Sequence, residues 1–275
     1  MKQTISHIST GFPNFDALIG GLERAHLIII GSRAGMGKSA FAISLAKNVA
    51  VEQHVPTAFF TLDMSAGLMK RRFACCIGKI DQQKLTGDKL TEEKSNQYVD
   101  AYRKLRECPL FIDDTPGLSI AEFESKVTQL VTEHHVRVVV VDYLQLMITG
   151  TKDDNRKNEY SVITKRLRRI ADDLNLTIII CAMMQRKKKF SWNKPCLVHL
   201  RACAGNIDKY ADVVAFIYRP DFYCLVTPEN RGKRVMGLAE IIIKRNNLGN
   251  IGKFYLTFNT NASCMYEFRG IEFQE

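Results

Sequence analysis

The sequence predicts an α/β protein in which a mainly parallel sheet is covered by helices on both faces. Between residues 26 and 184, apolar segments of strand length alternate with segments of helical period. The run VRVVVVD at 136–142 is apolar almost throughout, as expected of a strand that is buried on both faces. Near the C-terminal end, strand-like segments follow one another without helical patterns between them, which predicts an antiparallel hairpin beside the parallel strands.

The elements before residue 185 follow in a regular order. Strands are predicted at 26–31, 57–63, 109–114, 136–142 and 176–184, and helices at 38–51, 67–78, 119–134 and 156–174. The helix at 119–134 has the clearest start signal, because Ser119 and Glu122 have the spacing of a capping box. The helix at 156–174 has the clearest apolar stripe, formed by Ile163, Leu167, Ile170 and Leu174.

The remaining strands are predicted at 211–219, 238–245 and 253–259. Gly249 and Asn250 lie between the last two segments and favour a tight turn there. The chain has no internal repeat and no Pro-rich or Ser-rich linker. We therefore expect a single domain over residues 1–275.

Composition excludes several classes of protein. Hydrophobic residues make up 46% of the chain, which is enough for a full core. No run of 18 apolar residues exists, and the N-terminal MKQTISHISTGF lacks the apolar region of a secretion signal. Eight cysteines occur without a C-x-x-C pair or zinc-finger spacing. These features predict a cytoplasmic protein with reduced thiols and no membrane association, and the net charge of +10 favours a polyanionic partner.

The segment SRAGMGKS at 32–39 predicts a phosphate-binding loop. It fits the pattern G-x-x-x-x-G-K-[ST] except that Ser32 takes the first glycine position. The glycines let backbone N–H groups wrap a phosphate, Lys38 can reach the β and γ phosphates, and Ser39 can bind Mg²⁺. The alternative, an ordinary glycine-rich turn, fits the order of strand, loop, Lys-Ser and helix less well. The predicted ATP-binding loop comprises Ala34, Gly35, Met36, Gly37, Lys38, Ser39 and Ala40.

A phosphate-binding loop of this kind needs a second carboxylate for Mg²⁺. Asp142 ends the apolar run RVVVVD, and we predict that it binds the ion through a water molecule. The alternative is a turn residue or a helix cap, which the long apolar strand before Asp142 makes less attractive.

At this point the motifs resemble a known family. The segments ISTGFPNFDALIGGL, FFTLDMS, FIDDTPGLSI, VVVVDYLQLM, LRACAGNIDKYADVVAFIYR and AEIIIKRNNLGNIG, together with the phosphate loop, occur in order between Ile8 and Phe268. Their wording and spacing are similar to those of the C-terminal ATPase domain of DnaB-type replicative helicases. VDYLQLM and AEIII belong to that family rather than to phosphate-loop proteins in general.

The resemblance implies a RecA-like P-loop NTPase core, a homo-oligomeric ring of six, and ATP with Mg²⁺ between subunits. It also implies single-stranded DNA in the central channel, movement along it in the 5′ to 3′ direction, and separate replication proteins as partners. The motifs begin almost at Met1, so we expect no N-terminal domain or linker helix, and a ring less stable than the family's for that reason.

Several functional positions carry over from the family. Lys38, Ser39 and Asp142 match its lysine, hydroxyl and Walker B carboxylate, and Gln145 and Arg219 join the predicted ATP-binding set. The family's water-activating glutamate is replaced here by Asp63, whose side chain is one methylene shorter. We take Asp63 as the residue that orients the water, although a misplacement of about 1 Å can cost about 10²-fold in rate.

Two further positions depart from the family. Met183 stands where the family has a glutamine that senses the γ-phosphate, and Gln185 can substitute only if the strand end is shifted. Asn247 stands at the position of the arginine finger, which reaches into the neighbouring subunit's site. Arg245 can take that role only after a slip of the hairpin. A finger contributes about 10³-fold or more in related phosphoryl transfer.

Two segments predict contact with DNA. In LRACAGNID, which resembles the family's DNA loop with one added residue, the candidates are Arg201, Gly205 and Asn206. The stretch RKKKFSW joins basic residues to Phe190 and Trp192, a combination that suits a single strand. A solvated loop anchored by its rings is the alternative for this stretch. Its basic members are Arg186, Lys187, Lys188 and Lys189. A further basic cluster, formed by Lys165, Arg166, Arg168 and Arg169, is better explained as the solvated face of an amphipathic helix.

The sequence therefore predicts an ATP-hydrolysing helicase domain that engages single-stranded DNA. A second hypothesis is a degenerate relative that binds ATP and docks on DNA or on a helicase ring with little turnover. The altered positions Asp63, Met183 and Asn247 favour it. A recombination or clock-type ATPase of the RecA superfamily is a weaker third hypothesis, because DYLQLM is not typical of those proteins.

Overall fold

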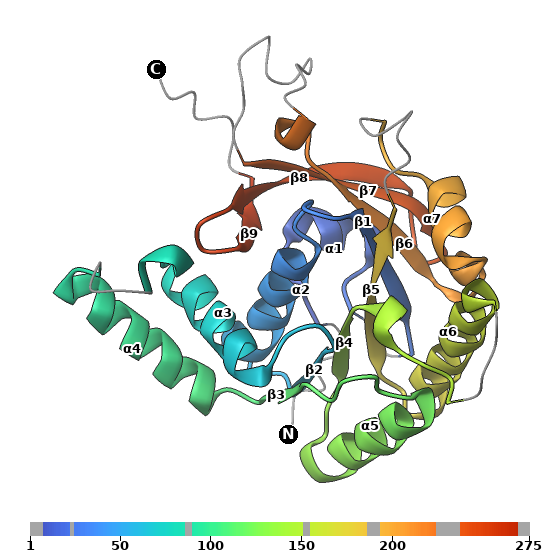
Figure 1. Cartoon of the computed structure of the whole chain (residues 1–275), viewed down its shortest axis with the longest axis horizontal. Coiled ribbons are helices and arrows are strands. Elements are labelled where there is room, and N and C mark those ends of the chain that lie inside the picture. Colours follow the sequence, from blue (N-terminus) through green and yellow to red (C-terminus); the bar gives the residue numbers. More distant parts are fainter. Residues whose placement is uncertain are drawn as a thin grey trace.

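A nine-stranded sheet organises the described part of the chain, in the order β3-β2-β4-β5-β1-β6-β7-β8-β9 (Figure 1). The computed structural model describes residues 8–22, 25–85, 90–150, 155–185, 193–223 and 237–268. The strands are β1 (Leu27–Arg33), β2 (Thr57–Thr61), β3 (Leu110–Asp113), β4 (Val138–Asp142), β5 (Thr177–Met184), β6 (Val213–Tyr218), β7 (Leu238–Asn246), β8 (Gly252–Asn259) and β9 (Cys264–Glu267).

The sheet combines a parallel and an antiparallel part, as the sequence predicts. Strands β1 to β6 pair in parallel with one another. Strands β7, β8 and β9 continue the sheet beyond β6 in antiparallel fashion, and β7 and β8 form the predicted hairpin. The predicted mainly parallel sheet with an antiparallel C-terminal hairpin is therefore confirmed.

Helices cover both faces of the sheet, because alternate residues of each central strand point to opposite sides. The helices are α1 (Pro13–Ile19), α2 (Lys38–Lys47), α3 (Ala66–Gly78), α4 (Glu92–Glu107), α5 (Ile120–His134), α6 (Arg156–Asp173) and α7 (Leu197–Ala204). Ile28 and Ile30 of β1 pack in the core layer of α1, α2 and α3. Leu27 and Ile29 pack instead in the layer of α5, α6 and α7, which lies on the other side of the sheet (Figure 1).

The capping box predicted at the start of α5 is present. The Ser119 side chain accepts a hydrogen bond from the Glu122 N–H at 3.2 Å, and the Glu122 carboxylate accepts from the Ser119 N–H at 3.1 Å. Two N–H groups that the first helical turn leaves without partners are thereby satisfied. A cap of this kind typically contributes about 1 kcal/mol to stability.

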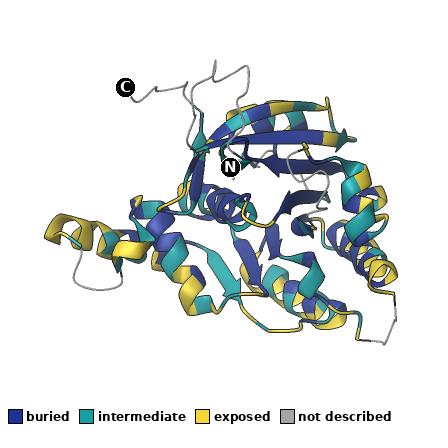
Figure 2. Ribbon diagram, turned by 45° about the horizontal axis from the view of Figure 1, so that its top comes forward, coloured by how far each residue is buried: buried dark blue, intermediate teal, exposed yellow. Residues whose placement is uncertain are grey.

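Four elements have no counterpart among the predicted ones, namely α1, α4, α7 and β9. Helix α4 buries only Ala101 and Leu105 and exposes most of its length (Figure 2), because its apolar positions are confined to its C-terminal half. Its start is nonetheless encoded locally, since the Thr91 side chain accepts a hydrogen bond from the Lys94 N–H. Helix α2 ends earlier than predicted and continues as a π-helical turn over Asn48–Glu52. No described helix is long and apolar enough to span a lipid bilayer.

Candidate nucleotide-binding site

The phosphate loop lies at the carboxyl ends of the parallel strands. It joins β1 to α2, and Asp142 ends β4, with β5 between the two strands. In open α/β sheets ligands bind outside this edge, where helices on opposite faces diverge. The fold therefore brings together the two segments that the sequence predicts as parts of one site.

The loop has the backbone geometry that anion binding requires. Gly35 and Gly37 have φ values of 80° and 91°, in the left-handed region that glycine adopts without strain. Gly37 caps α2 and provides no side-chain hydrogen bond to the first N–H groups of that helix. These N–H groups, with the positive end of the helix dipole, form an anion site. A Cβ atom on Gly37 would lie 2.7 Å from Cε of Met265, so the end of the Met265 side chain would have to move, and the positive φ would strain any larger residue.

The residues of the predicted phosphate loop differ in their exposure to solvent. Ala34 and Gly35 are exposed, whereas Lys38 and Ser39 are half-buried at the first turn of α2. Met36 and Ala40 are buried and pack in the core beneath the loop. Of these last two residues, only backbone groups are therefore available to a phosphate.

Lys38 and Asp142 form an ion pair across the end of β5. The amine also lies over the ring of Tyr143, 4.4 Å from its centroid. Burial lowers the pKa of Lys38, but Cys181 and Asp142 act more strongly together, and the net effect raises that pKa above its usual value. The lysine is thus held as a cation beside the predicted Mg²⁺ carboxylate, which is only 5% exposed.

Asp63 reaches the same edge from β2. Thr61 pairs with Asp142 in the sheet, and the Leu62 N–H donates to the Asp142 carbonyl at 3.0 Å. Asp63 follows directly and is exposed. Burial and the charge of Asp63 raise the pKa of Tyr143, so the Asp63 carboxylate acts on the phenol whose ring lies under the Lys38 amine. Asp63 is thus an exposed carboxylate at the same edge of the sheet as Asp142.

Arg219 forms hydrogen bonds with other residues of the chain in this structure. It is 8% exposed and bonds both oxygens of Asp221, at 3.2 and 2.8 Å. It also donates to the Gly35 carbonyl at 3.5 Å, and its guanidinium lies over the Phe258 ring at 4.3 Å. Arg219 therefore supports the phosphate loop from the end of β6, and direct contact with nucleotide stays a prediction.

The Gln145 amide bonds the backbone of Met183 in this structure, and contact of Gln145 with nucleotide stays a prediction. The side chain donates to the Met183 carbonyl and accepts from the Met183 N–H, both at 2.9 Å. Strand alternation puts Met183 on the same face of β5 as Cys181, which packs in the core layer of α2. Gln185 lies beyond the end of β5 and is exposed, and its N–H contacts the Cys203 sulfur at 3.3 Å.

Arg72 is a charged neighbour of the site that sequence reasoning missed. Its guanidinium contacts the Met64 sulfur at 3.1 Å and the Ser263 hydroxyl at 3.5 Å. Burial lowers the pKa of Arg72, and the charge of Asp142 opposes this effect. The signal in the sequence was weak, because Arg72 stands among other basic residues in an amphipathic helix.

The finger candidates lie at the opposite edge of the sheet. Strand β7 runs antiparallel to β6, so its end lies beside the start of β6, where the Asn247 N–H donates to the Asp212 carbonyl at 2.8 Å. Asn247 is exposed. Arg245 is half-buried beside a β-bulge, and its Nε is buried without a hydrogen-bond partner among the described residues. Neither residue can reach the phosphate loop of its own chain.

The predicted DNA contacts are placed only in part. Arg201 forms a bidentate pair with the buried Asp208, with its shortest contact at 2.6 Å. The Gly205 N–H bonds the Arg201 carbonyl at 3.0 Å, and Asn206 is exposed. The stretch 186–189, with Arg186, Lys187, Lys188 and Lys189, lies outside the described residues.

The arginines of the basic cluster on α6 are paired with carboxylates, as a solvated face would be. Arg166 bonds Glu124, Arg168 bonds Asp172 and Asp212, and Arg169 bonds Asp173. These pairs support the interpretation of this face as a surface of the fold rather than a DNA site.

The backbone conformation and the surroundings of Gly205 require glycine at this position. Its φ of 68° and ψ of −162° suit glycine alone, and a Cβ atom would lie 2.7 Å from the Lys157 carbonyl of α6. We expect Gly205→Ala to destabilise the protein by about 1–3 kcal/mol, measured by thermal or denaturant unfolding. Gly67→Ala is the matched control, because Gly67 lies in α3 with open space around it. Equal stability of the two variants would contradict this account.

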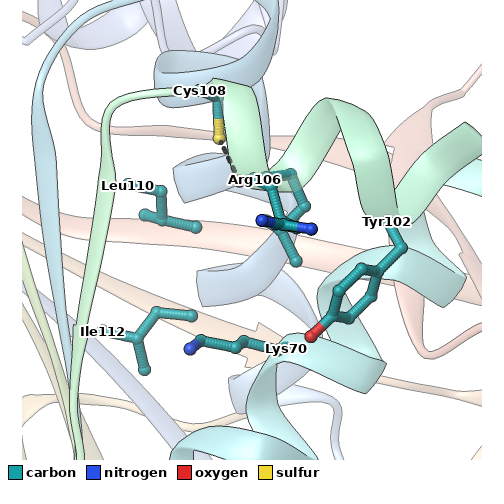
Figure 3. A pocket seen from close by; sticks show the side chains of 7 residues that line it. Lys70, Tyr102, Arg106, Cys108, Leu110 and Ile112 are labelled. Atoms are coloured by element: carbon teal, nitrogen blue, oxygen red, sulfur yellow. Dashed lines mark hydrogen bonds between the residues drawn. The ribbon is translucent and has the colours of Figure 1, made fainter.

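A cavity of about 360 Å³ lies away from the nucleotide site, between α3, α4 and the edge strand β3 (Figure 3). Basic and phenolic side chains of the helices face apolar side chains of the strand. The lining residues are Lys70, Tyr102, Leu105, Arg106, Cys108, Leu110 and Ile112. None belongs to the phosphate loop or to the end of β4, so this cavity is separate from the predicted chemistry.

Comparisons with known proteins agree with this geometry. The chain is 36% identical over 259 residues to the replicative DNA helicase DnaC of Bacillus subtilis, covering 94% of this chain and 56% of that protein. It is 34% identical over 256 residues to the replicative DNA helicase DnaB of Geobacillus stearothermophilus, covering 92% and 55%. The chain thus spans about half the length of these relatives.

Solved structures give the same result for the fold. A structure described as an ATPase domain matches with a TM-score of 0.87 and 25% identity, over 98% of this chain and 93% of that one. A DnaB-like replicative helicase, described with its interactions with primase, matches with the same TM-score and identity, over 96% of this chain and 62% of that one. The predicted RecA-like fold is therefore confirmed. Since residues 7–267 also match the family model of the DnaB-like helicase C-terminal domain, this chain belongs to that family.

Proposed function

We propose that residues 1–275 form one ATPase domain of a replicative DNA helicase, which binds ATP with Mg²⁺ and acts on single-stranded DNA. The observation that carries the proposal is the Lys38–Asp142 pair beside the uncapped start of α2. A half-buried cation at the start of α2 and a buried carboxylate at the end of β4, with β5 between their strands, suit a triphosphate and its metal ion. Membership of the family and relatives that are replicative DNA helicases support the choice of reaction.

The residues present fit Mg²⁺ and ATP. Ser39 stands at the first turn of α2 and Asp142 at the end of β4, so a hydroxyl and a water-bridging carboxylate are available to the ion. When bound, the ion neutralises charge on the β and γ phosphates. Lys38 leaves the Asp142 carboxylate to contact the same phosphates, and Asp63 orients the water that attacks phosphorus. The proton of that water passes toward the Asp63 carboxylate as the bond to the leaving ADP oxygen breaks.

We further propose that turnover requires a homo-oligomer, for which a ring of six is the family's arrangement. The support is topological: Asn247 and Arg245 lie at the sheet edge opposite Lys38, so residues of the hairpin can reach only another subunit's site. One structural relative is described with primase, and we propose a separate replication protein as a partner in the same way. A role in replication also supports the cytoplasm as the location that we propose for this protein.

A second candidate function is ATP-dependent binding with little hydrolysis. This function is favoured by the side chains at three positions. In the family, the residues at these positions stabilise the transition state. Asp63 is short, Met183 cannot donate to phosphate, and Asn247 has no charge. Binding residues are retained and rate-determining residues are altered, so affinity and turnover are expected to separate.

One experiment distinguishes the two functions. Steady-state ATP hydrolysis is measured with and without single-stranded DNA, on protein whose assembly state is determined in the same sample by light scattering. An active helicase domain hydrolyses ATP faster when DNA is added and the protein is assembled. Tight ATP binding with neither basal nor DNA-stimulated turnover, in assembled protein, would establish the binding module instead.

The basic stretch 187–189 is expected to contribute to DNA affinity by binding phosphates. Replacing Lys187, Lys188 and Lys189 by Ala should weaken binding of single-stranded DNA. It should also reduce the slope of log affinity against log salt by up to about 0.7 for each phosphate that the protein no longer binds. The measurement is fluorescence anisotropy over a range of salt concentrations. The triple change of Lys84, Lys94 and Lys104 to Ala is the matched control, because these lysines are exposed and lie far from the stretch along the chain. Equal slopes in both variants would remove the stretch from the DNA site.

A further inference from the structure

Side chains on one face of α3 contact β9 and the residue before it, although these elements lie far apart in the chain (Figure 1). The Arg72 guanidinium donates to the Ser263 hydroxyl at 3.5 Å. One helical turn later, the Cys76 thiol shares a hydrogen bond with the sulfur of Cys264, the first residue of β9. Residues four apart lie on the same face of a helix, so the two contacts are neighbours. The fold thus brings together two cysteines that most of the chain separates.

The Ser44 hydroxyl of α2 holds both partners of this contact. Its oxygen lies 3.8 Å from the Cys76 sulfur and accepts a hydrogen bond from the Met265 N–H at 2.8 Å. Met265 follows Cys264 directly, so α2 fixes β9 at the point where the two thiols meet. Only 2% of Cys76 and none of Cys264 is exposed, and both pack in the core layer of α2 and α3. The two sulfur atoms are therefore held side by side in the core.

The two cysteines are free thiols in this structure. Sulfur atoms that already share a hydrogen bond need only a short approach to reach the length of a disulfide bond, which is about 2 Å. No C-x-x-C spacing marks the pair in the sequence, because its members belong to different elements. The tertiary structure alone makes them candidates for a disulfide.

The surroundings make Cys264 the more reactive of the two thiols. The hydrogen bond with Cys76 lowers the pKa of Cys264, and burial opposes this effect. The Tyr266 hydroxyl and the charges of Lys47 and Lys79 lower the same pKa further. The shared hydrogen bond and burial raise the pKa of Cys76 well above its usual value. Because the thiolate is the nucleophile, Cys264 is the residue that an oxidant meets first.

Strand β9 is the part of this contact that can open. It has four residues, pairs with β8 on one side and lies at the edge of the sheet. Short edge elements open locally at a lower free-energy cost than the centre of a sheet. A small oxidant can therefore reach the Cys264 sulfur without unfolding of the parallel strands.

We propose that Cys76 and Cys264 are a redox-sensitive thiol pair, which hydrogen peroxide converts into a disulfide that joins α3 to β9. The Cys264 thiolate attacks one peroxide oxygen and the O–O bond breaks. The hydroxide that leaves takes up the proton that Cys264 released, which gives water and a sulfenic acid. The Cys76 sulfur then attacks the sulfenic sulfur, the S–S bond forms, and the S–O bond breaks as a second water molecule leaves with the Cys76 proton. The two sulfurs lose two electrons and peroxide gains them.

The pair is separate from the proposed ATPase chemistry. Neither cysteine belongs to the residues that we assign to ATP, Mg²⁺ or DNA, so the inference stands independently of the proposed function. In a reducing compartment such a disulfide is transient, and thiol–disulfide exchange with a reduced dithiol returns both thiols.

Peptide mapping of the full chain tests the proposal. The folded protein is treated with hydrogen peroxide, its remaining thiols are blocked, and digested peptides are analysed by mass spectrometry. We expect the peptide of Cys76 to be linked to that of Cys264, and dithiothreitol to separate them. Absence of this link in the unaltered protein would overturn the proposal.

Variants identify which of two adjacent thiols reacts. Cys75→Ala is the matched control for Cys76→Ala, because Cys75 is equally buried beside it in α3 and burial raises its pKa to about 11. Cys75→Ala should keep the link to Cys264, and Cys76→Ala should lose it. A link that persists in Cys76→Ala and disappears in Cys75→Ala would overturn the assignment of Cys76.

Thermal unfolding shows whether the disulfide belongs to the folded protein. A disulfide that closes a long loop restricts the unfolded chain, so the oxidised protein should unfold at least about 4 °C above the same sample after dithiothreitol is added. The comparison within one sample cancels oxidation of methionine, which dithiothreitol leaves in place. Cys76→Ala should show no such difference. Equal unfolding temperatures in the linked unaltered protein would overturn the proposal, since the bond would then not fit the native contact of α3 with β9.

Discussion

Lys38→Ala is expected to lower ATP affinity by about 10- to 100-fold or more, and to abolish hydrolysis. The lysine charge and the loop N–H groups act on the same phosphates, and a hydrogen bond to a charged group contributes about 1.5–3 kcal/mol. The structure adds that Lys38 is half-buried and already a cation, so its charge is available without a protonation step. Isothermal titration calorimetry with ATP and Mg²⁺ measures the affinity.

The control for this variant is Lys47→Ala. Lys47 lies at the other end of α2 and pairs with Glu52 at 3.3 Å, so the substitution removes the same charge from the same helix. Lys38→Ala also leaves the buried Asp142 without its cation, which is destabilising. Adding Asp142→Asn to Lys38→Ala removes that effect, and thermal unfolding shows whether each variant is folded. A folded Lys38→Ala protein with unchanged ATP affinity would remove the phosphate-loop assignment.

Turnover by the unaltered protein is expected to be well below the enzyme median of about 10 s⁻¹, and the double variant Asp63→Glu with Asn247→Arg is expected to raise kcat by at least about 10²-fold. Lys38, Ser39 and Asp142 contact a phosphate that is charged before reaction. Asp63 and Asn247 stand at positions that orient water and neutralise the charge of the transition state. Removing interactions of the second kind lowers kcat more than affinity.

The topology allows a sharper test of this prediction. Because Asn247 lies at the edge opposite the phosphate loop, an arginine there acts only on a neighbouring subunit. Lys38→Ala/Asn247→Arg subunits supply an arginine finger but no working site, and Asp63→Glu subunits supply a site but no finger. A mixture of the two should hydrolyse ATP, although neither variant does so alone. Lys38→Ala subunits with the native Asn247 are the control and should add nothing.

Fast ATP turnover by the unaltered protein would contradict this prediction. It would mean that Asp63, Gln185 and Arg245 perform the altered roles. In the present structure Gln185 is exposed beyond β5, and the Nε of the half-buried Arg245 has no hydrogen-bond partner within the described part of the chain. Both side chains would then have to reorient when subunits assemble around ATP.

Much of the fold could be predicted because its signals are local. The strand at 136–142 is apolar almost throughout, the capping box at Ser119 needs only residues three apart, and the phosphate loop is a contiguous segment. Helix α4 was missed because its apolar stripe is short. Apolar residues at helical spacing occur only from Tyr98 to Leu105, most of the helix is exposed, and its first turns depend on the cap and on helix propensity.

The site was predicted as a set of residue types and not as a set of contacts. The sequence by itself determined that Lys38, Ser39 and Asp142 are the candidates for a phosphate and metal site, because a glycine-rich loop and an apolar strand ending in aspartate specify that chemistry locally. Only the tertiary structure decided that Gln145 bonds Met183, that Arg219 bonds Asp221 and that Arg201 bonds Asp208. In each case the sequence alone does not show whether the polar side chain bonds a ligand or another residue of the chain. The choice follows from which partner the fold brings within about 3 Å, because a polar group that loses water on folding needs a partner that replaces it.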